Sequence, residues 1–200
     1  LERYALHITL AGILTLCVGL FYANKLQFSL NMLEWFHASH PVRMANTQIE
    51  QHMSGSMQVE LVVRRSDLDG EPLELVQLAE IDAWLDALIS APPANVPISS
   101  VVSVVGLLKE ATAVLQPEVG YQLPSSPELL AQELLLLQFD SNNSLAKLMD
   151  NAMREVRITL AIPWQDSLQY NHVLKEISHS FYQHTQHLQL QQTGMATLSN

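Results

Sequence analysis

The chain has 200 residues, with 20 Asp and Glu against 10 Lys and Arg, and a formal net charge of -10 at pH 7. So acidic a composition argues against a nucleic-acid partner, because affinity for phosphates comes from basic groups. It also argues against a polybasic segment docking on anionic lipid. The only cysteine, Cys17, rules out a disulfide framework.

The first predicted element is a helix over residues 5–23, a stretch without Asp, Glu, Lys or Arg. A helix of about 20 mostly apolar residues is long enough to cross the hydrocarbon core of a bilayer, and it satisfies its own backbone hydrogen bonds. We therefore predict a transmembrane helix within residues 1–25. A signal peptide or a buried core helix is less favoured, because the apolar run is long and Asn24-Lys25-Leu26-Gln27 is a poor cleavage site.

Residues 26–56 are predicted to form a connecting segment with one short helix. Ser39-His40-Pro41 opens that helix, since proline suits a first-turn position, and Ser54-Gly55-Ser56 closes it after Met53. The segment before it is rich in large apolar side chains. It reads either as a strand packed on the domain or, through Trp35, as an interfacial anchor.

Residues 57–200 are predicted to form one α+β domain. Four segments read as strands, because their apolar residues alternate with a period of two or, in one of them, form a run rich in valine. Two amphipathic helices lie between these strands in the sequence. Outside an insertion at about 106–153, the order is strand, helix, strand, strand, helix, strand. That order predicts a ferredoxin-like βαββαβ domain, with both helices on one face of an antiparallel sheet. The strands are expected at 57–64, 98–105 and 155–163 and from Leu188 to Thr193, and the helices at 75–90 and 166–184.

The insertion is predicted to be helical, with pieces at 107–115, from Ser126-Pro127 to Phe139, and at 145–153. Its middle helix is apolar through a full turn. Burial in the core is the favoured interpretation, and contact with a neighbouring domain, a partner chain or an apolar substrate is the alternative. The residues of this candidate apolar contact surface are Leu134, Leu135, Leu136, Leu137 and Phe139.

The strongest candidate for a metal site is the set His172, Glu176 and His179. At i, i+4 and i+7 these side chains share one face of the last predicted helix, and imidazole with carboxylate can bind zinc. The spacing is not that of the metalloprotease motif, which needs Glu next to the first His. A solvated polar face is therefore the favoured interpretation, with zinc binding the weaker one.

No pattern predicts catalysis. The sequence has no glycine-rich phosphate loop and no Gly-x-Ser-x-Gly elbow. Asp67, Asp69 and Glu71 resemble half of a calcium loop but lack its glycine and distal glutamate. We therefore expect no enzyme activity, no catalytic or cofactor-binding residues, and no cofactor.

A series of short motifs follows one another along the chain. In chain order the motifs are Asn31-Met32-Leu33-Glu34-Trp35-Phe36, Ser39-His40-Pro41-Val42-Arg43, Ser54-Gly55-Ser56, Ile98-Ser99-Ser100-Val101-Val102, Tyr121-Gln122-Leu123-Pro124, Leu134–Leu137 and Arg157-Ile158-Thr159. Through the order of these motifs the chain resembles the large loops of resistance–nodulation–division (RND) exporters. It is most similar to the branch of lipid exporters that includes MmpL-like and hopanoid-transporter-like proteins.

The resemblance implies one transmembrane helix followed by a large periplasmic loop, with the second of the two loops favoured. Such loops fold into ferredoxin-like porter domains of proton-driven exporters. The implied location is the inner (plasma) membrane, with residues from about 26 onward on the periplasmic side. The implied partners are the lipid bilayer, a hydrophobic or lipid cargo and the rest of the transporter chain, and a homo-oligomer is left open. The alternative function is a membrane-tethered, extracytoplasmic ligand-sensing or interaction domain.

Overall fold

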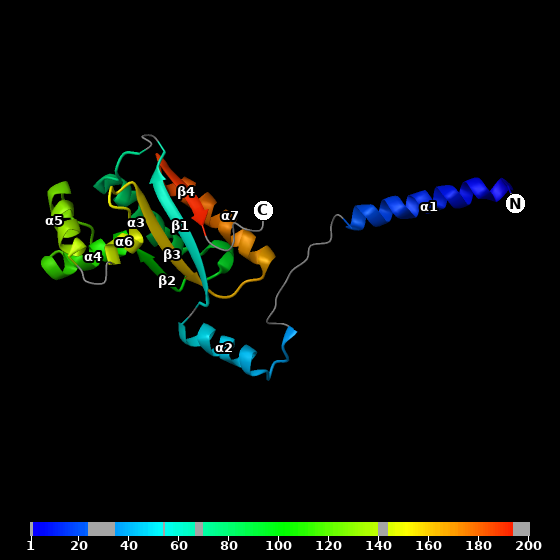
Figure 1. The fold of residues 1–200 in the computed structure, drawn as a ribbon, viewed down its shortest axis with the longest axis horizontal. Helices are drawn as coiled ribbons and strands as arrows, with labels where there is room; N and C mark the ends of the chain where they lie inside the picture. The colour runs from blue at the N-terminus through cyan, green and yellow to red at the C-terminus, as the bar shows by residue number, and fades with distance from the viewer. Residues whose placement is uncertain (1, 24–34, 54, 67–69, 140–143, 194–200) are drawn as a thin grey trace. The chain divides into compact units, whose positions relative to one another are not determined.

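The computed structural model describes residues 2–23, 35–53, 55–66, 70–139 and 144–193 (Figure 1). The chain divides into two compact units, Leu1–Leu30 and Asn31–Asn200. The first holds helix α1 (Glu2–Ala23), so the predicted helix at 5–23 is confirmed. Within the described residues, however, no helix combines the length and the apolar character that a membrane crossing requires. The spanning role of residues 1–25 stays a prediction.

Four strands form an antiparallel sheet in the second unit, in the order β2-β3-β1-β4 (Figure 1). Strand β1 pairs with β3 from Met57↔Ile162 to Arg64↔Glu155, and its other edge pairs with β4. Because β1 and β2 both run antiparallel to β3 and lie on either side of it, they are parallel strands split by a third. The predicted α+β class and antiparallel sheet are confirmed. The strands are β1 (Met57–Arg65), β2 (Ser100–Ser103), β3 (Glu155–Ile162) and β4 (Leu188–Thr193).

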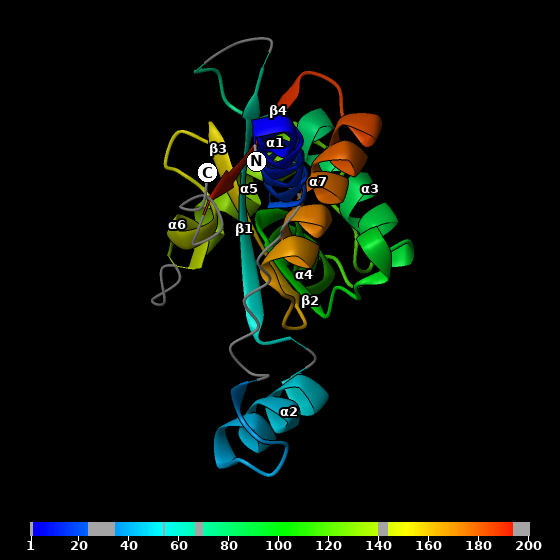
Figure 2. The ribbon, with the colours of Figure 1, turned by 90° about the vertical axis from the view of Figure 1, so that its right-hand side faces the viewer.

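Helices α3 (Leu75–Ser90) and α7 (Ser167–His184) lie on one side of the sheet (Figure 2). Alternate strand residues such as Leu61 and Ile158 are fully buried beneath them, as the period of two requires. Trp84 of α3 meets Phe181 of α7 edge to face, with ring centroids 5.0 Å apart. Both aromatic rings are inaccessible to solvent, so this contact lies at the centre of the core.

Helix α2 (Pro41–Met53) begins at the predicted proline. The Arg43 side chain donates to the carbonyl oxygen of Phe36 at 3.1 Å, and the Phe36 and His40 rings lie 4.6 Å apart. Trp35 is exposed. Most of the preceding predicted strand or anchor lies in residues 24–34, outside the described residues.

The insertion is helical as predicted, but its boundaries differ. The expected strand at 98–105 is confined to β2, because Ser103 caps helix α4 (Val104–Leu115): its Oγ accepts from the N–H of Gly106 at 3.2 Å. Helix α5 (Pro127–Gln138) follows. The expected helix at 145–153 is only the short α6 (Ser144–Leu148), which packs against β3 on the side of the sheet away from α3 and α7 (Figure 2).

Candidate functional site

Helix α5 supports the candidate site and begins where the sequence predicts. The Ser126 Oγ accepts from the N–H of Leu129 at 3.3 Å, and Pro127 occupies the first turn, where its missing N–H costs nothing. The rest of the helix consists of Glu, Gln, Ala and Leu, which are good helix formers. The helix packs against α4 and α6.

The predicted apolar surface is divided between two faces of α5. Leu134 joins Leu130 in the hydrophobic core, and Leu137 is partly buried against it. On the outer face, Leu135 is 56%, Leu136 is 55% and Phe139 is 85% exposed. Core burial therefore accounts for Leu134 and in part for Leu137, whereas Leu135, Leu136 and Phe139 present large apolar groups to solvent.

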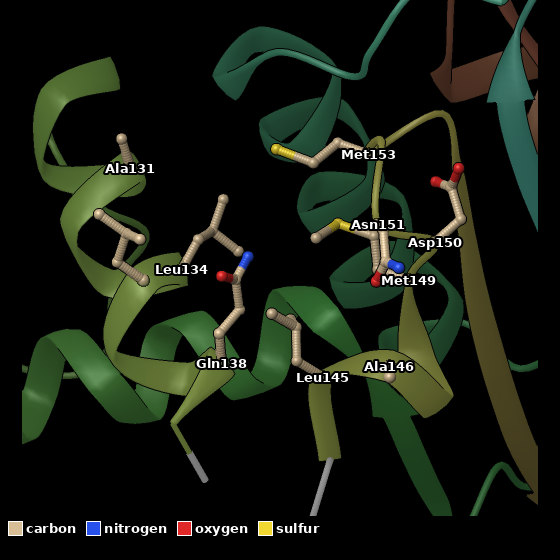
Figure 3. A pocket seen from close by; sticks show the side chains of 10 residues that line it. Ala131, Leu134, Gln138, Leu145, Ala146, Met149, Asp150, Asn151 and Met153 are labelled. Atoms are coloured by element: carbon tan, nitrogen blue, oxygen red, sulfur yellow. The ribbon is translucent and has the colours of Figure 1, made fainter.

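A pocket of about 260 Å³ lies between α5, α6 and the turn that follows α6. Figure 3 shows Leu134 and Gln138 reaching from α5 toward Met149 and Met153 on the opposite wall. We call this hollow the apolar pocket. It is lined by Ala131, Leu134, Leu135, Gln138, Leu145, Ala146, Met149, Asp150, Asn151 and Met153.

Asp150 fixes the turn that forms the far wall of the apolar pocket. Its Oδ1 accepts the backbone N–H groups of Arg154 at 2.6 Å and Glu155 at 3.0 Å, and its Oδ2 accepts Nε of Arg154 at 3.4 Å. Burial alone would raise the pKa of Asp150, but these hydrogen bonds bring it below its usual value. The carboxylate therefore stays charged and ends α6 by holding the chain in a tight turn, with Met153 at a φ of 57°.

The methionines give this pocket an adaptable wall. Met149 is buried and Met153 partly buried against the core, and both side chains point toward α5 (Figure 3). Unbranched thioether side chains change rotamer easily and fit apolar groups of varied shape. The pocket is slightly smaller than the usual range of about 300–1,000 Å³ for ligand sites, so it suits a single slender apolar group.

A buried carboxyl lies behind the same helix. Glu133 is inaccessible to solvent, and its Oε1 accepts from the hydroxyl of Thr112 on α4 at 2.9 Å. Among the residues that the structure describes, its Oε2 has no hydrogen-bond partner. The Thr112–Glu133 hydrogen bond links α4 to α5 on the core side of α5. Neither residue lines the apolar pocket, but the bond helps to hold α5, which forms one of its walls.

The three candidate zinc ligands do not converge. His172 Nε2 lies 3.5 Å from Glu176 Oε1, but Oε2 of Glu176 accepts the backbone N–H of Ala94. The ring of His179 instead contacts the amide of Gln183 at 2.9 Å. In the part of the chain that the structure describes, no group of three His, Cys, Asp or Glu is placed to hold a metal ion. Glu176 anchors the turn Pro93–Asn95, where Ala94 and Asn95 have positive φ values.

Of the ten residues that line the apolar pocket, only Leu134 and Leu135 belong to the predicted apolar surface. Leu145, Met149 and Met153 fall where a continuous helix was expected. The signal that could have found them is the Asp150-Asn151 pair between two methionines, because Asp and Asn favour turns over helix interiors. Of Asp67, Asp69 and Glu71, the two aspartates lie outside the described residues.

No protein-family model matches the chain, and no curated protein matches it significantly.

Proposed function

We propose that this chain is the extracytoplasmic, ferredoxin-like porter-type domain of a proton-driven RND-type exporter of lipid or other hydrophobic molecules. Within that machine its task is to bind apolar cargo without converting it chemically. The connectivity β1–α3–β2 and β3–α7–β4 around a split pair of parallel strands supports the porter-type interpretation. The RND assignment rests on the order of the sequence motifs.

One observation carries the binding role: the exposed leucine of α5 next to the apolar pocket. Leu135 is more than half exposed and also lines the pocket, and Leu136 and Phe139 extend the apolar surface beyond it. Large apolar groups that are gathered on one exposed face mark a contact site more often than a scattered arrangement does. A concave wall of leucine and methionine is suited to a hydrocarbon group.

The location in the plasma membrane, with residues from about 26 onward on the periplasmic side, belongs to the same proposal. So do its partners: the bilayer, the cargo and the rest of the transporter chain. These parts rest on the resemblance and on the uncharged composition of residues 5–23. Extraction of the native membranes with alkaline carbonate tests them, because an embedded chain stays in the pellet and a peripheral one is released.

A second candidate is a ligand-sensing or interaction domain. Leu136 and Phe139 favour it, since they are exposed but do not line the pocket, and a flat apolar surface suits a protein partner. Proton-driven uptake into inverted membrane vesicles separates the two. An exporter moves the probe only when a proton gradient is present, whereas a sensor binds it without transport.

Binding is tested with N-phenyl-1-naphthylamine, a neutral apolar dye whose fluorescence rises in an apolar environment. An external dye is needed because none of the three tryptophans lines the apolar pocket, and Trp84 is fully buried in the core. We expect saturable binding to the full chain. Leu135→Ser should weaken it about tenfold, because the dye covers Leu135 only in part and the loss lies at the lower end of the roughly 1.5–3 kcal/mol of a fully buried leucine.

The matched control is Val76→Ser on α3, where the valine is 64% exposed and does not line the pocket. This variant should bind the dye as the unaltered chain does. Thermal unfolding of both variants shows that they remain folded. Equal losses in the two variants, or no saturable binding to the unaltered chain, would contradict the proposed function.

A further inference from the structure

Half of the basic residues of the chain line two hollows that adjoin the apolar pocket. The hollows have volumes of about 370 Å³ and 160 Å³, and we call them the basic hollows. Asp150 lines both of them and the apolar pocket, and Ala146 and Met149 line the smaller one and the apolar pocket. Their basic residues are Arg64, Arg65, Lys147, Arg154 and Arg157, five of the 10 Lys and Arg in the chain.

The sheet register brings two of these cations together. Val62 pairs with Arg157 and Arg64 pairs with Glu155, so Arg64 and Arg157 are diagonal neighbours on one face of the β1–β3 ladder. Glu155 lies directly opposite Arg64 on this face, whereas Arg157 lies directly opposite the apolar Val62. Lys147 on α6 lines the same hollow as Arg157, so a second cation is placed in the hollow beside it.

Two of the five cations already form ion pairs, Arg65 with Glu74 at 3.1 Å and Arg154 with Asp150 at 3.4 Å. The basic hollows are lined by three carboxylates, Glu71, Asp150 and Glu155, against five cations, whereas the chain as a whole has twice as many acids as bases. Asp150 is already engaged by two backbone N–H groups and by Arg154. Within the described residues, Lys147 and Arg157 form no ion pair.

We propose that the ligand of this domain is an acidic amphiphile, with its hydrocarbon chain in the apolar pocket and an anionic head group at Lys147 and Arg157. The inference rests on the proposed binding function and specifies its ligand. Guanidinium and ammonium groups bind carboxylate or phosphate oxygens through charge-assisted hydrogen bonds. An unpaired pair of cations beside an apolar cavity, in an otherwise acidic chain, selects for such a head group.

The test compares two molecules that differ only in charge, dodecanoate and 1-dodecanol, as competitors of N-phenyl-1-naphthylamine on the full chain. Both are used below their aggregation concentrations. We expect dodecanoate to bind about tenfold more tightly than dodecanol, since one or two charge-assisted hydrogen bonds distinguish them. Arg157→Gln with Lys147→Gln should abolish this preference and leave the affinity for dodecanol unchanged.

Lys175→Gln is the control for a general effect of charge, to be compared with Arg157→Gln alone. Lys175 is exposed on α7 and lines neither the apolar pocket nor the basic hollows. Arg157→Gln should reduce the preference for dodecanoate, and Lys175→Gln should leave it intact. A preference that is equally reduced in both variants overturns the assigned head-group position.

The remaining outcomes separate the two proposals. Equal affinities of dodecanoate and dodecanol, with Leu135→Ser weakening both, refute the acidic head group and leave the binding function standing. If neither molecule displaces the dye and binding of the dye itself is not saturable, the proposed binding function is refuted. Thermal unfolding of each Gln variant shows whether the fold is retained, and dodecanol binding provides the same check at the site.

Discussion

The buried pair of Thr112 and Glu133 shows how much one residue contributes to the site. Glu133 is enclosed between α4 and α5 with a single hydrogen bond, 2.9 Å from its Oε1 to the Thr112 hydroxyl. Removing one partner of a buried polar pair leaves the other without a hydrogen bond, which costs more than the pair contributed. The stability of the α4–α5 contact therefore depends on both residues being present, or on both being apolar.

Thr112→Val should lower the free energy of unfolding by about 1–3 kcal/mol, because the Glu133 carboxyl then has no partner. Thr112→Val combined with Glu133→Leu should recover most of that loss, since an apolar pair of similar volume often replaces a buried polar one at little cost. Urea unfolding at pH 7 measures both. A single variant as stable as the unaltered chain would show that water reaches Glu133.

The residue types in the sequence predicted which side chains form the core, but they did not predict the polar contacts between elements. Alternation along β1 and β3 predicted the buried residues, because a sheet covered on one face requires a period of two. Nothing in the local sequence marks Glu133 as buried, and tertiary packing places it beside Thr112. The pocket wall at Met149 and Met153 likewise depends on the Asp150 turn, whose hydrogen bonds reach four and five residues ahead.

At the scale of elements, side-chain caps determine where the inserted helices begin. Ser103 and Ser126 each accept an N–H three residues ahead, from Gly106 and Leu129. Sequence reasoning found the cap at Ser126, where proline follows, and missed the one at Ser103, where valines continue the pattern of a strand. A capped start fixes the rotation of α5, and with it the residues that face the pocket.

Ser126→Ala should destabilise the fold by about 1 kcal/mol, because the first turn of α5 loses its side-chain acceptor. Ser125→Ala is the control, since Ser125 is exposed and precedes the cap. Chemical denaturation gives both values. Dye affinity should fall with Ser126→Ala as well, because fraying of α5 displaces Leu134 and Leu135. Identical stabilities for the two variants would mean that the cap contributes nothing.

At the scale of the whole molecule, the hydrophobic core belongs to one of the two compact units. Each residue of the core cluster lies at or beyond position 57, within the unit Asn31–Asn200. That unit contains the sheet, α3 and α7, and the insertion with its pocket. Strands that are far apart in the sequence of this unit pair with each other, as β1 does with β4, so the described sheet forms within this unit.

A chain lacking residues 1–30 should therefore unfold at the same temperature as the full chain, within about 2 °C. A difference of 1 kcal/mol would shift the midpoint of a domain of this size by about 2–4 °C. Differential scanning calorimetry measures it, and dye binding shows whether the pocket is preserved. A clear drop in the midpoint would reveal stabilising contacts from residues 1–30.

The two faces of α5 also bear on how this protein can evolve. Leu130 and Leu134 are buried in the core, whereas Leu135, Leu136 and Phe139 are exposed and contribute little to the stability of the fold. Substitutions on exposed positions usually change stability by less than about 0.5 kcal/mol. Mutation can therefore retune what the outer face recognises while the scaffold stays intact, so lineages that share this sheet can diverge quickly in what they bind.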